Sequence, residues 1–227
     1  MLGAAVDRFR ARARRSRAET FRELFPVSAS TRVLDLGGGN GSHIHYVLRA
    51  TPALPENVCV ADIDELALKD CASRFGFTSV VIDENGRLPF PDRAFDIVFC
   101  SSVIEHVTVP KKSIWLLRSG RGFRELARRR QLAFAEEIRR VGKGYLVQVP
   151  YPWFPIESHT WLPFFNFLPR PAQIRLMRLT NRFWVKQSVP DFHLPTTREM
   201  RACFPDARIL REKFLGLTKS LIACKVT

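Results

Sequence analysis

The sequence predicts an α/β protein built around a doubly wound, largely parallel sheet. Short runs that are apolar at nearly every position alternate along the chain with longer amphipathic segments, as expected for strands covered by helices on both faces. The expected strands are residues 31–36, 58–63, 79–82, 94–100 and 145–149, and the helices that follow them are 42–50, 64–75, 121–140 and 196–204. Two closing runs, 207–214 and 220–226, are separated by Gly216, which indicates an antiparallel pair.

A further helix is expected before the first strand. Residues 4–25 are rich in arginine and place their apolar residues near one face, and Pro26 ends the pattern. We therefore expect residues 1–26 to form a basic amphipathic helix and residues 27–227 to form the main domain.

The composition is that of a globular protein with a large excess of positive charge. The chain has 227 residues, of which 46% are apolar and 26% charged, so global disorder is excluded. The net charge of +14 is unevenly distributed: residues 31–110 are net acidic, whereas residues 1–25, 111–143 and 170–186 are strongly basic. Such basic segments fit either an anionic partner or solvated helix faces, and both interpretations stay open.

The cysteines and the N-terminus bear on the cellular compartment. The five cysteines form no C-x-x-C pair, which favours reduced, buried thiols. The N-terminal segment lacks the apolar stretch of a secretory signal. We therefore expect a cytoplasmic protein without a transmembrane helix. The cysteines and histidines also lack the spacing of zinc ligands, and we expect no metal.

The strongest motif lies directly after the first strand. Residues 35–41 read Asp-Leu-Gly-Gly-Gly-Asn-Gly, a D-x-G-x-G-x-G pattern between a strand and a helix. Glycines allow positive φ angles and let the backbone approach a ligand closely. A dinucleotide site would space the glycines as G-x-G-x-x-G, and Asp35 would repel a pyrophosphate. A carboxylate here suits a cationic ligand group, such as the α-amino or sulfonium region of S-adenosylmethionine.

Acidic residues follow the next two strands. Asp62 ends the second strand, where a carboxylate can accept hydrogen bonds from both ribose hydroxyls, and Asp64 is better explained as a helix N-cap. After the third strand, a side chain of Asp83 or Glu84 could meet an adenine amino group, although a turn at Asn85 explains the composition equally well.

These motifs together resemble class I S-adenosylmethionine-dependent methyltransferases, most closely the bacterial methyltransferase type 11 group. The resemblance rests on VLDLGGGNG (33–41), VADID (60–64), RLPFPDRAFDIVF (87–99) and SSVIEHV (101–107), and continues loosely through 205–225. It implies a Rossmann-like seven-stranded sheet with strand 7 antiparallel, and S-adenosylmethionine as cofactor. The implied cofactor-binding residues are Asp35, Gly37, Gly39, Asn40, Gly41, Asp62, Ile63, Asp83 or Glu84, and Ser101. One departure is a loop one residue longer between Asp83 and Leu88, which leaves the choice between Asp83 and Glu84 open.

Two groups are candidates for catalysis, and each also has a structural explanation. His106 follows the fourth strand and has the intrinsic pKa of a general base at neutral pH, but it could equally be a helix residue with a structural hydrogen bond. Glu157 and His159 lie in an aromatic segment after the fifth strand, where they could form a base with an orienting carboxylate. The alternative is a structural role, in which the hydrogen bonds of these two side chains hold the proline-rich loop in place. His193 is a weaker candidate.

The aromatic segment also suggests the kind of acceptor. Residues 150–171 contain seven of the 25 aromatic residues and six prolines, and basic segments flank them. We expect residues 150–195 to form an insert that serves as acceptor pocket or lid. The composition favours methyl transfer to oxygen of a small-molecule, glycan or lipid acceptor, and peripheral contact with an anionic membrane. An RNA methyltransferase and a non-catalytic cofactor-binding subunit are the alternatives, and the absence of an Asn-Pro-Pro-Tyr-type tetrapeptide after the fourth strand disfavours RNA.

Overall fold

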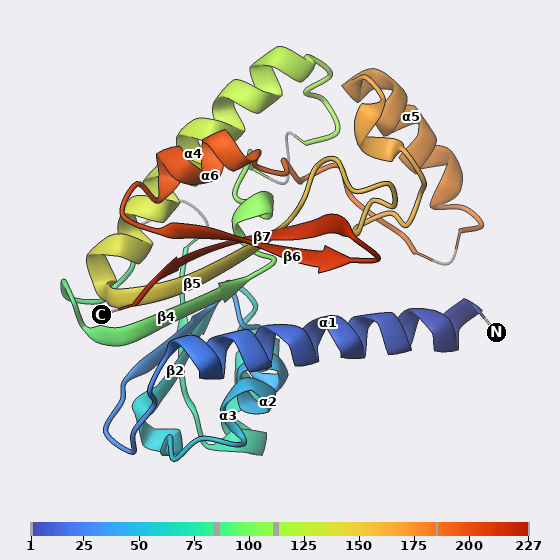
Figure 1. Cartoon of the computed structure of the whole chain (residues 1–227). Coiled ribbons are helices and arrows are strands. Elements are labelled where there is room, and N and C mark those ends of the chain that lie inside the picture. The colour runs from blue at the N-terminus through green and yellow to red at the C-terminus, as the bar shows by residue number, and fades with distance from the viewer. Residues whose placement is uncertain (1, 84–86, 111–113, 185, 227) are drawn as a thin grey trace. The chain divides into compact units, whose positions relative to one another are not determined.

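A computed structural model describes residues 2–83, 87–110, 114–184 and 186–226 and confirms the predicted fold class (Figure 1). Seven strands form one sheet in the order β3-β2-β1-β4-β5-β7-β6. The strands are β1 (Val33–Leu36), β2 (Val58–Asp62), β3 (Thr78–Val81), β4 (Phe95–Ser101), β5 (Gly142–Pro150), β6 (Arg208–Phe214) and β7 (Leu217–Lys225). The helices are α1 (Leu2–Leu24), α2 (Ser42–Leu48), α3 (Glu65–Phe75), α4 (Gly120–Val141), α5 (Arg170–Thr180) and α6 (Thr197–Cys203).

The N-terminal strands have the burial that their sequences predict, except at one edge. β1 pairs in parallel with β2 and with β4, and β2 pairs in parallel with β3. Every residue of β1 is buried, and β2 and β4 are nearly so. The prediction that the strands are buried on both faces is wrong for β3, whose Thr78 and Val81 are exposed. The reason is that β3 is the outermost strand of the sheet.

By contacts, residues 1–100, 140–146 and 226–227 form a first compact unit. Its helix α3 is capped at both ends as its sequence predicts. Asp64 caps α3 by accepting hydrogen bonds from the backbone N–H groups of Leu66 and Ala67, as predicted, and Gly76 ends that helix in the left-handed conformation. Near the end of α1, Phe21 is buried and its ring meets that of Phe99 edge to face, with centroids 5.7 Å apart. The C-terminal part of α1 is therefore anchored in the core of this unit.

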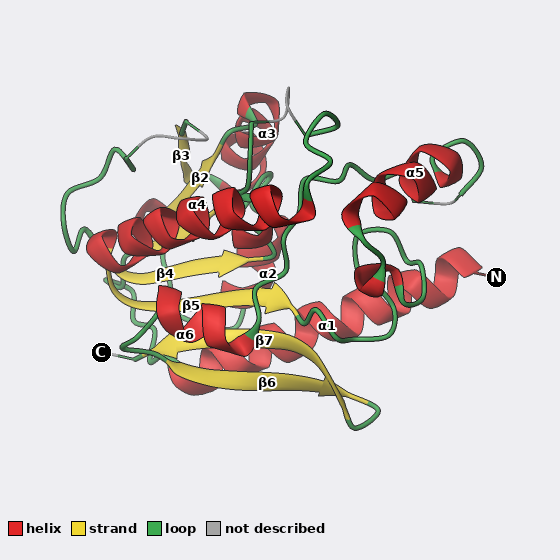
Figure 2. Cartoon of the chain, turned by 90° about the horizontal axis from the view of Figure 1, so that it is seen from above, coloured by secondary structure: helices red, strands yellow, loops and turns green. Residues whose placement is uncertain are grey.

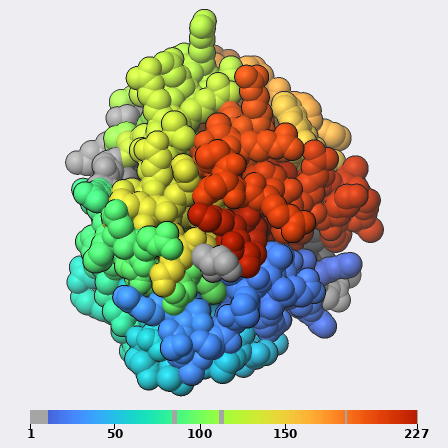
Figure 3. All heavy atoms as spheres, turned by 60° about the vertical axis from the view of Figure 1, so that its left-hand side comes forward, coloured from blue at the N-terminus to red at the C-terminus, as the bar shows by residue number. Residues whose placement is uncertain are grey.

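Residues 101–139 and 147–225 form a second compact unit, which contains the antiparallel hairpin β6–β7 (Figure 2). Ion pairs tie α4 to the C-terminal segment: Arg128 with Glu199, and Arg139 with Asp206 at 3.3 Å. The space-filling view shows α4 in yellow-green beside the orange-to-red α6 and hairpin (Figure 3). Part of the basic charge on α4 is therefore engaged in ion pairs within this unit.

The insert after β5 contains a helix that the sequence analysis did not identify. Residues 151–164 form an irregular loop closed by a bridge between Ile156 and Pro163, and a short 3₁₀ turn leads into α5. Helix α5 covers much of the segment that was interpreted only as a basic run. The interpretation of its charge is partly wrong, because the buried guanidinium of Arg170 donates hydrogen bonds to backbone carbonyls inside this unit.

Smaller differences concern boundaries and burial. The long helix α4 ends at Val141, one residue beyond the expected end, and β5 starts at Gly142 instead of at residue 145. All five cysteines are unpaired and buried, as predicted. Within the described residues, no helix combines the length and the apolar character needed to cross a membrane.

Candidate functional site

The glycine loop after β1 has the backbone conformation that its sequence predicts. Gly37, Gly39 and Gly41 have φ angles of 73°, 54° and 70°, values that residues with a side chain rarely adopt. The backbone N–H of Gly37 donates to the carbonyl of Ala61 at 2.7 Å, which fixes the loop against the end of β2. Gly37 and Gly39 are half-buried, so part of the loop backbone is accessible to a ligand.

Asp35 lies beneath this loop as a buried carboxylate. Its side chain is 2% exposed, and its Oδ2 atom has no hydrogen-bond partner. Burial, with a smaller contribution from the charge of Asp62, raises the pKa of Asp35 to about 8. A buried carboxylate without a partner is costly, so this site favours a cationic group that would satisfy it.

Asp62 and its neighbours lie at the end of β2. One oxygen of Asp62 accepts from the N–H of Gly39 at 2.8 Å and the other from the N–H of Asp64 at 3.0 Å. A carboxylate has about four acceptor positions, so two remain for ribose hydroxyls. Ile63 is 42% exposed, which leaves its side chain accessible for packing against a ring.

The remaining predicted cofactor residues have different surroundings. The amide of Asn40 donates to Asp70 at 3.3 Å and accepts from the N–H of Ser42, so it stabilises the loop from within. Asp83 is exposed, and Glu84 lies outside the described residues. The hydroxyl of Ser101 donates to Oε1 of Gln148 at 2.9 Å, in the second compact unit.

The predicted pairing of Glu157 with His159 is present. Oε1 of Glu157 lies 2.7 Å from Nδ1 of His159, and its two oxygens also accept from the N–H groups of His159 and Thr160. Burial would raise the pKa of Glu157, but these hydrogen bonds outweigh it and lower that pKa. Burial would likewise lower the pKa of His159, but the carboxylates of Glu105 and Glu157 raise it to about 9. His159 is therefore protonated at neutral pH in this arrangement and is poorly suited to act as a free base.

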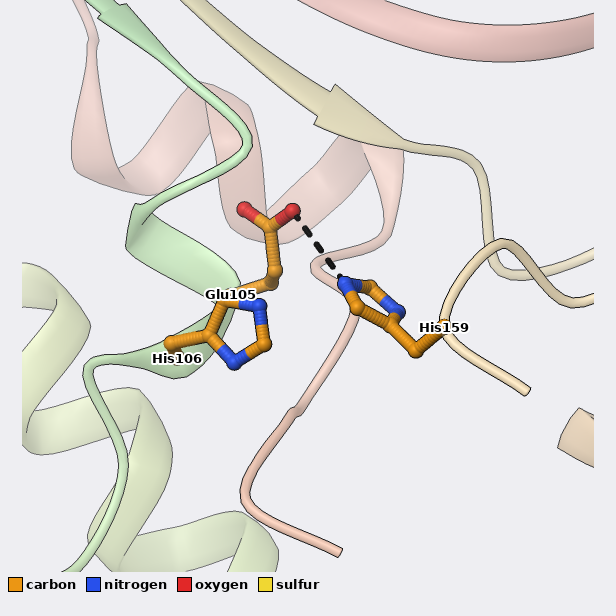
Figure 4. A group of neighbouring side chains, drawn as sticks. All are labelled: Glu105, His106 and His159. Carbon is orange, nitrogen blue, oxygen red and sulfur yellow. Dashed lines mark ion pairs between the residues drawn. The ribbon is translucent and has the colours of Figure 1, made fainter. Parts of the chain in front are cut away.

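Glu105, which follows the fourth strand and was not selected as a site residue, lies beside His106 and His159 (Figure 4). We call these three residues the Glu105–His106–His159 cluster. It lies with His106 on a 3₁₀ turn, residues 104–106, that follows β4, whereas His159 comes from the loop after β5. Oε1 of Glu105 is 3.7 Å from Nε2 of His159, beyond hydrogen-bond distance. The Glu105 side chain is fully buried, and neither carboxylate oxygen has a hydrogen-bond partner.

His106 has its own carboxylate partner. Its Nδ1 atom is 3.2 Å from Oδ1 of Asp191, and its ring meets that of His159 edge to face with centroids 4.8 Å apart. One candidate ligand atom from each of Glu105, His106 and His159 lies within 4.8 Å of the other two, a spacing from which a metal ion could be held. The expectation of no metal considered only ligands close together in the sequence.

The 3₁₀ turn that carries Glu105 is held by buried polar groups. Gln131 donates to the carbonyls of Ile104 and His193, and its Oε1 lies 3.1 Å from Nδ1 of His193. The N–H of His193 donates to the carbonyl of Glu105 at 2.8 Å. Burial lowers the pKa of His193 to about 4. His193 is thus a neutral residue that positions the turn.

Comparisons with known proteins agree with the fold and with the glycine loop. Residues 34–117 match the family model described as "Methyltransferase domain". The comparison with curated proteins gives no match. Among solved structures, an S-adenosylmethionine-dependent methyltransferase from Mesorhizobium loti is 16% identical, with 91% of this chain and 95% of that chain covered and a TM-score of 0.55.

Two further structures have a similar extent of likeness. Magnesium protoporphyrin IX methyltransferase from Synechocystis PCC 6803, solved with bound SAH, is 15% identical, with 94% and 82% of the two chains covered and a TM-score of 0.53. An S-adenosylmethionine-dependent methyltransferase from Aquifex aeolicus is 16% identical, with 91% and 87% covered and a TM-score of 0.50. At these identities the likeness establishes the fold.

The sheet order and the glycine loop define a class I methyltransferase fold. Residues 34–117, which include the glycine loop, match a methyltransferase domain, and the buried carboxylate beside that loop fits S-adenosylmethionine as cofactor.

Proposed function

We propose that this protein transfers a methyl group to an oxygen atom of a small-molecule, glycan or lipid acceptor. The observation that carries the cofactor part is Asp35, a fully desolvated carboxylate oxygen without a partner beside a loop of positive-φ glycines. Such a carboxylate would be compensated by the cationic methionine end of S-adenosylmethionine. When bound, this cofactor supplies a methyl group on a positively charged sulfur that leaves as a neutral thioether.

The residues of the first compact unit would hold and orient the cofactor. Asp35 would accept hydrogen bonds from its amino group, and Asp62 would use its remaining acceptor positions for the ribose hydroxyls. Ile63 would pack on the adenine ring. None of these residues needs to exchange a proton during transfer, so their contribution is binding and orientation.

The cluster of Glu105, His106 and His159 is the proposed place where an acceptor hydroxyl loses its proton. Oxygen acceptors need deprotonation, and this cluster contains His106 and His159, two of the three side chains predicted for catalysis. The third, Glu157, pairs with His159. His159, held protonated between two carboxylates, supports a role in binding and orienting rather than as the free base. His106 is 37% exposed and oriented by Asp191, so it is accessible to an acceptor.

An exposed aromatic cluster supports an amphiphilic acceptor. Trp153 and Phe167 have ring centroids 5.5 Å apart, Phe164 and Phe167 have theirs 6.2 Å apart, and all three side chains are more than half exposed. Aromatic side chains grouped on a surface favour contact with an apolar partner or a membrane interface. The following helix α5 exposes Arg175 and Arg178, which would suit an anionic headgroup. We therefore include peripheral binding to anionic membranes in the proposal.

The cofactor part is tested by thermal shift and isothermal titration of the full chain with S-adenosylmethionine. We expect binding by the wild type, loss of binding in Asp35→Asn, and no change in the control Glu19→Gln, whose carboxylate pairs with Arg15 on the surface of α1. Absence of binding by the folded wild type would contradict the proposal.

The acceptor part is tested with a labelled methyl group. The protein is incubated with labelled cofactor and separate extracts of polar metabolites, glycans, lipids and RNA, and the products are identified by mass spectrometry. We expect an O-methylated product in one of the first three fractions that is missing with Asp35→Asn. Labelling of RNA alone would overturn the proposed acceptor class and favour the nucleic-acid alternative.

A further inference from the structure

We infer that Glu105, His106 and His159 form a binding site for one divalent transition-metal ion. This inference rests on the proposed function, because the site is the cluster to which we assign acceptor deprotonation. One imidazole comes from the same 3₁₀ turn as the glutamate and the other from a loop more than fifty residues later in the chain (Figure 4).

The first observation is the state of Glu105. A fully buried carboxylate with no hydrogen bond to either oxygen is costly, and the nearest cationic group, Nε2 of His159, is 3.7 Å away. A cation bound between Glu105 and the two rings would compensate the buried charge directly. The unsatisfied side chain lies within the same cluster as the two histidines.

The second observation is the orientation of the two histidines. Nδ1 of His159 is 2.7 Å from Glu157, and Nδ1 of His106 is 3.2 Å from Asp191. Histidines that bind metals through one ring nitrogen almost always donate the other N–H to a carboxylate, a backbone carbonyl or water, which fixes the ring and its tautomer. Because a carboxylate faces Nδ1 of each ring, Nε2 of each is the candidate ligand atom, and the ion would displace the proton from Nε2 of His159 into solvent.

The donor set and the spacing indicate the class of ion. Two imidazoles with one carboxylate suit Zn²⁺ and similar borderline ions, whereas Mg²⁺ prefers oxygen ligands. One possible ligand atom from each of the three residues lies within 4.8 Å of the other two. Metal bonds of about 2.1 Å require ligand atoms roughly 3.5 Å apart, so binding needs a closure of roughly 1 Å. His106 is exposed and the loop of His159 is irregular, so these two side chains can supply the movement.

Three protein ligands leave an open coordination position, which is typical of catalytic rather than structural metal sites. The 37% exposure of His106 gives this position access to solvent. An acceptor hydroxyl that occupies it would have its pKa lowered by the ion and would release its proton to water.

The experiment uses the full chain without an affinity tag, stripped with a chelator and dialysed. Zn²⁺ is the probe. Its stoichiometry is measured by plasma mass spectrometry and its affinity by isothermal titration. Co²⁺ gives an independent readout, because its visible absorption reports the ligands that bind it. We expect one equivalent of Zn²⁺ and weaker binding of Mg²⁺. Glu105→Gln and His159→Gln should lose the ion, and Glu157→Gln should weaken it about 10- to 100-fold through the orientation of His159.

Two variants keep the result interpretable. His106→Gln changes an exposed side chain, so the variant should fold even if the variants of buried residues misfold. Circular dichroism shows which variants are folded. The folded His106→Gln should bind Zn²⁺ at least tenfold more weakly than the wild type. His45→Gln is the control, because His45 is an exposed histidine of the first unit, stacked on Phe75, and its loss should leave Zn²⁺ binding unchanged.

The inference is overturned if the stripped wild type binds no Zn²⁺, or if His106→Gln and Glu105→Gln both bind it as the wild type does. S-adenosylmethionine binding is measured in the same samples with excess chelator. A stripped wild type that binds no Zn²⁺ but still binds the cofactor and transfers the methyl group would overturn the metal site alone and leave the proposed function intact. A protein that binds Zn²⁺ but no cofactor would overturn the proposed function instead.

Discussion

A Cβ atom at Gly38 would lie 2.1 Å from Oδ2 of Asp35, so the absence of a side chain at position 38 leaves room for the buried carboxylate. We predict that Gly38→Ala displaces Asp35 and abolishes S-adenosylmethionine binding, because no real Cβ tolerates such a contact. The measurement is isothermal titration of the folded variant.

The control for this prediction is Gly122→Ala on α4. A Cβ there would meet only Ser119 at 3.4 Å, and the position is helical, so the variant should bind the cofactor as the wild type does. Unchanged affinity in Gly38→Ala would show that Asp35 can move without consequence and would contradict its assigned role.

The raised pKa of Asp35 predicts a stability that depends on pH. The pKa of the folded state, about 8, lies above the ordinary value of 3.8, so folding takes up a proton. The contribution of Asp35 to the free energy of unfolding is therefore fully present below about pH 4. It is lost as the pH rises from there through about 8, by at most about 1.4 kcal/mol per pH unit. Asp35→Asn should therefore be more thermostable than the cofactor-free wild type, with a gap that widens from pH 5 to pH 8. A gap that is constant over this range would refute the burial of an ionisable Asp35.

The same carboxylate predicts proton release on cofactor binding. Near pH 6.5 Asp35 is mainly protonated in the free protein, whereas a cationic ligand favours its ionised form. Affinity for S-adenosylmethionine should therefore rise between pH 5.5 and 7.5, by up to about tenfold per unit. Titrations in buffers of different ionisation enthalpy should show about one proton released per ligand bound. Binding with no proton release would mean that Asp35 stays neutral in the complex.

The sequence predicted the parts of the protein whose contacts are local. The glycine loop could be predicted because positive φ angles select glycine at positions 37, 39 and 41, and the Glu157–His159 pair because the two residues are separated by one position. Glu105 could not be joined to His159 in this way, since their proximity depends on how the chain after β5 folds back.

Helix α5 was missed because its basic composition dominated the interpretation. The signals were present: Pro171 stands in the first turn, and Ile174 and Met177 are buried one turn apart. Arg170 could not have been recognised as a buried residue from composition, because its burial depends on carbonyls of residues 114, 117 and 190.

Arg170 gives a stability prediction. Its guanidinium donates to three backbone carbonyls from different segments and stacks over Phe123 at 3.4 Å. A lysine ammonium is a point charge that cannot span these acceptors. Arg170→Lys should lower the free energy of unfolding by about 2 kcal/mol, whereas the exposed neighbour Arg175→Lys should change it little. Denaturant unfolding of the two variants measures the difference, and equal stabilities would contradict the structural role of Arg170.

The exposed aromatic cluster predicts membrane binding. If Trp153, Phe164 and Phe167 insert into a bilayer interface, the double variant Phe164→Ser and Phe167→Ser should bind vesicles containing anionic lipid at least tenfold more weakly than the wild type. The control Leu66→Ser removes an exposed apolar side chain from α3 and should leave binding unchanged. Flotation of the wild type with vesicles of zwitterionic lipid alone separates the contribution of the aromatic residues from that of the basic residues. Weaker binding to these vesicles than to anionic vesicles indicates that the basic residues contribute. Equal flotation of the wild type and the double variant, or no flotation of the wild type with anionic vesicles, would contradict the membrane part of the proposal.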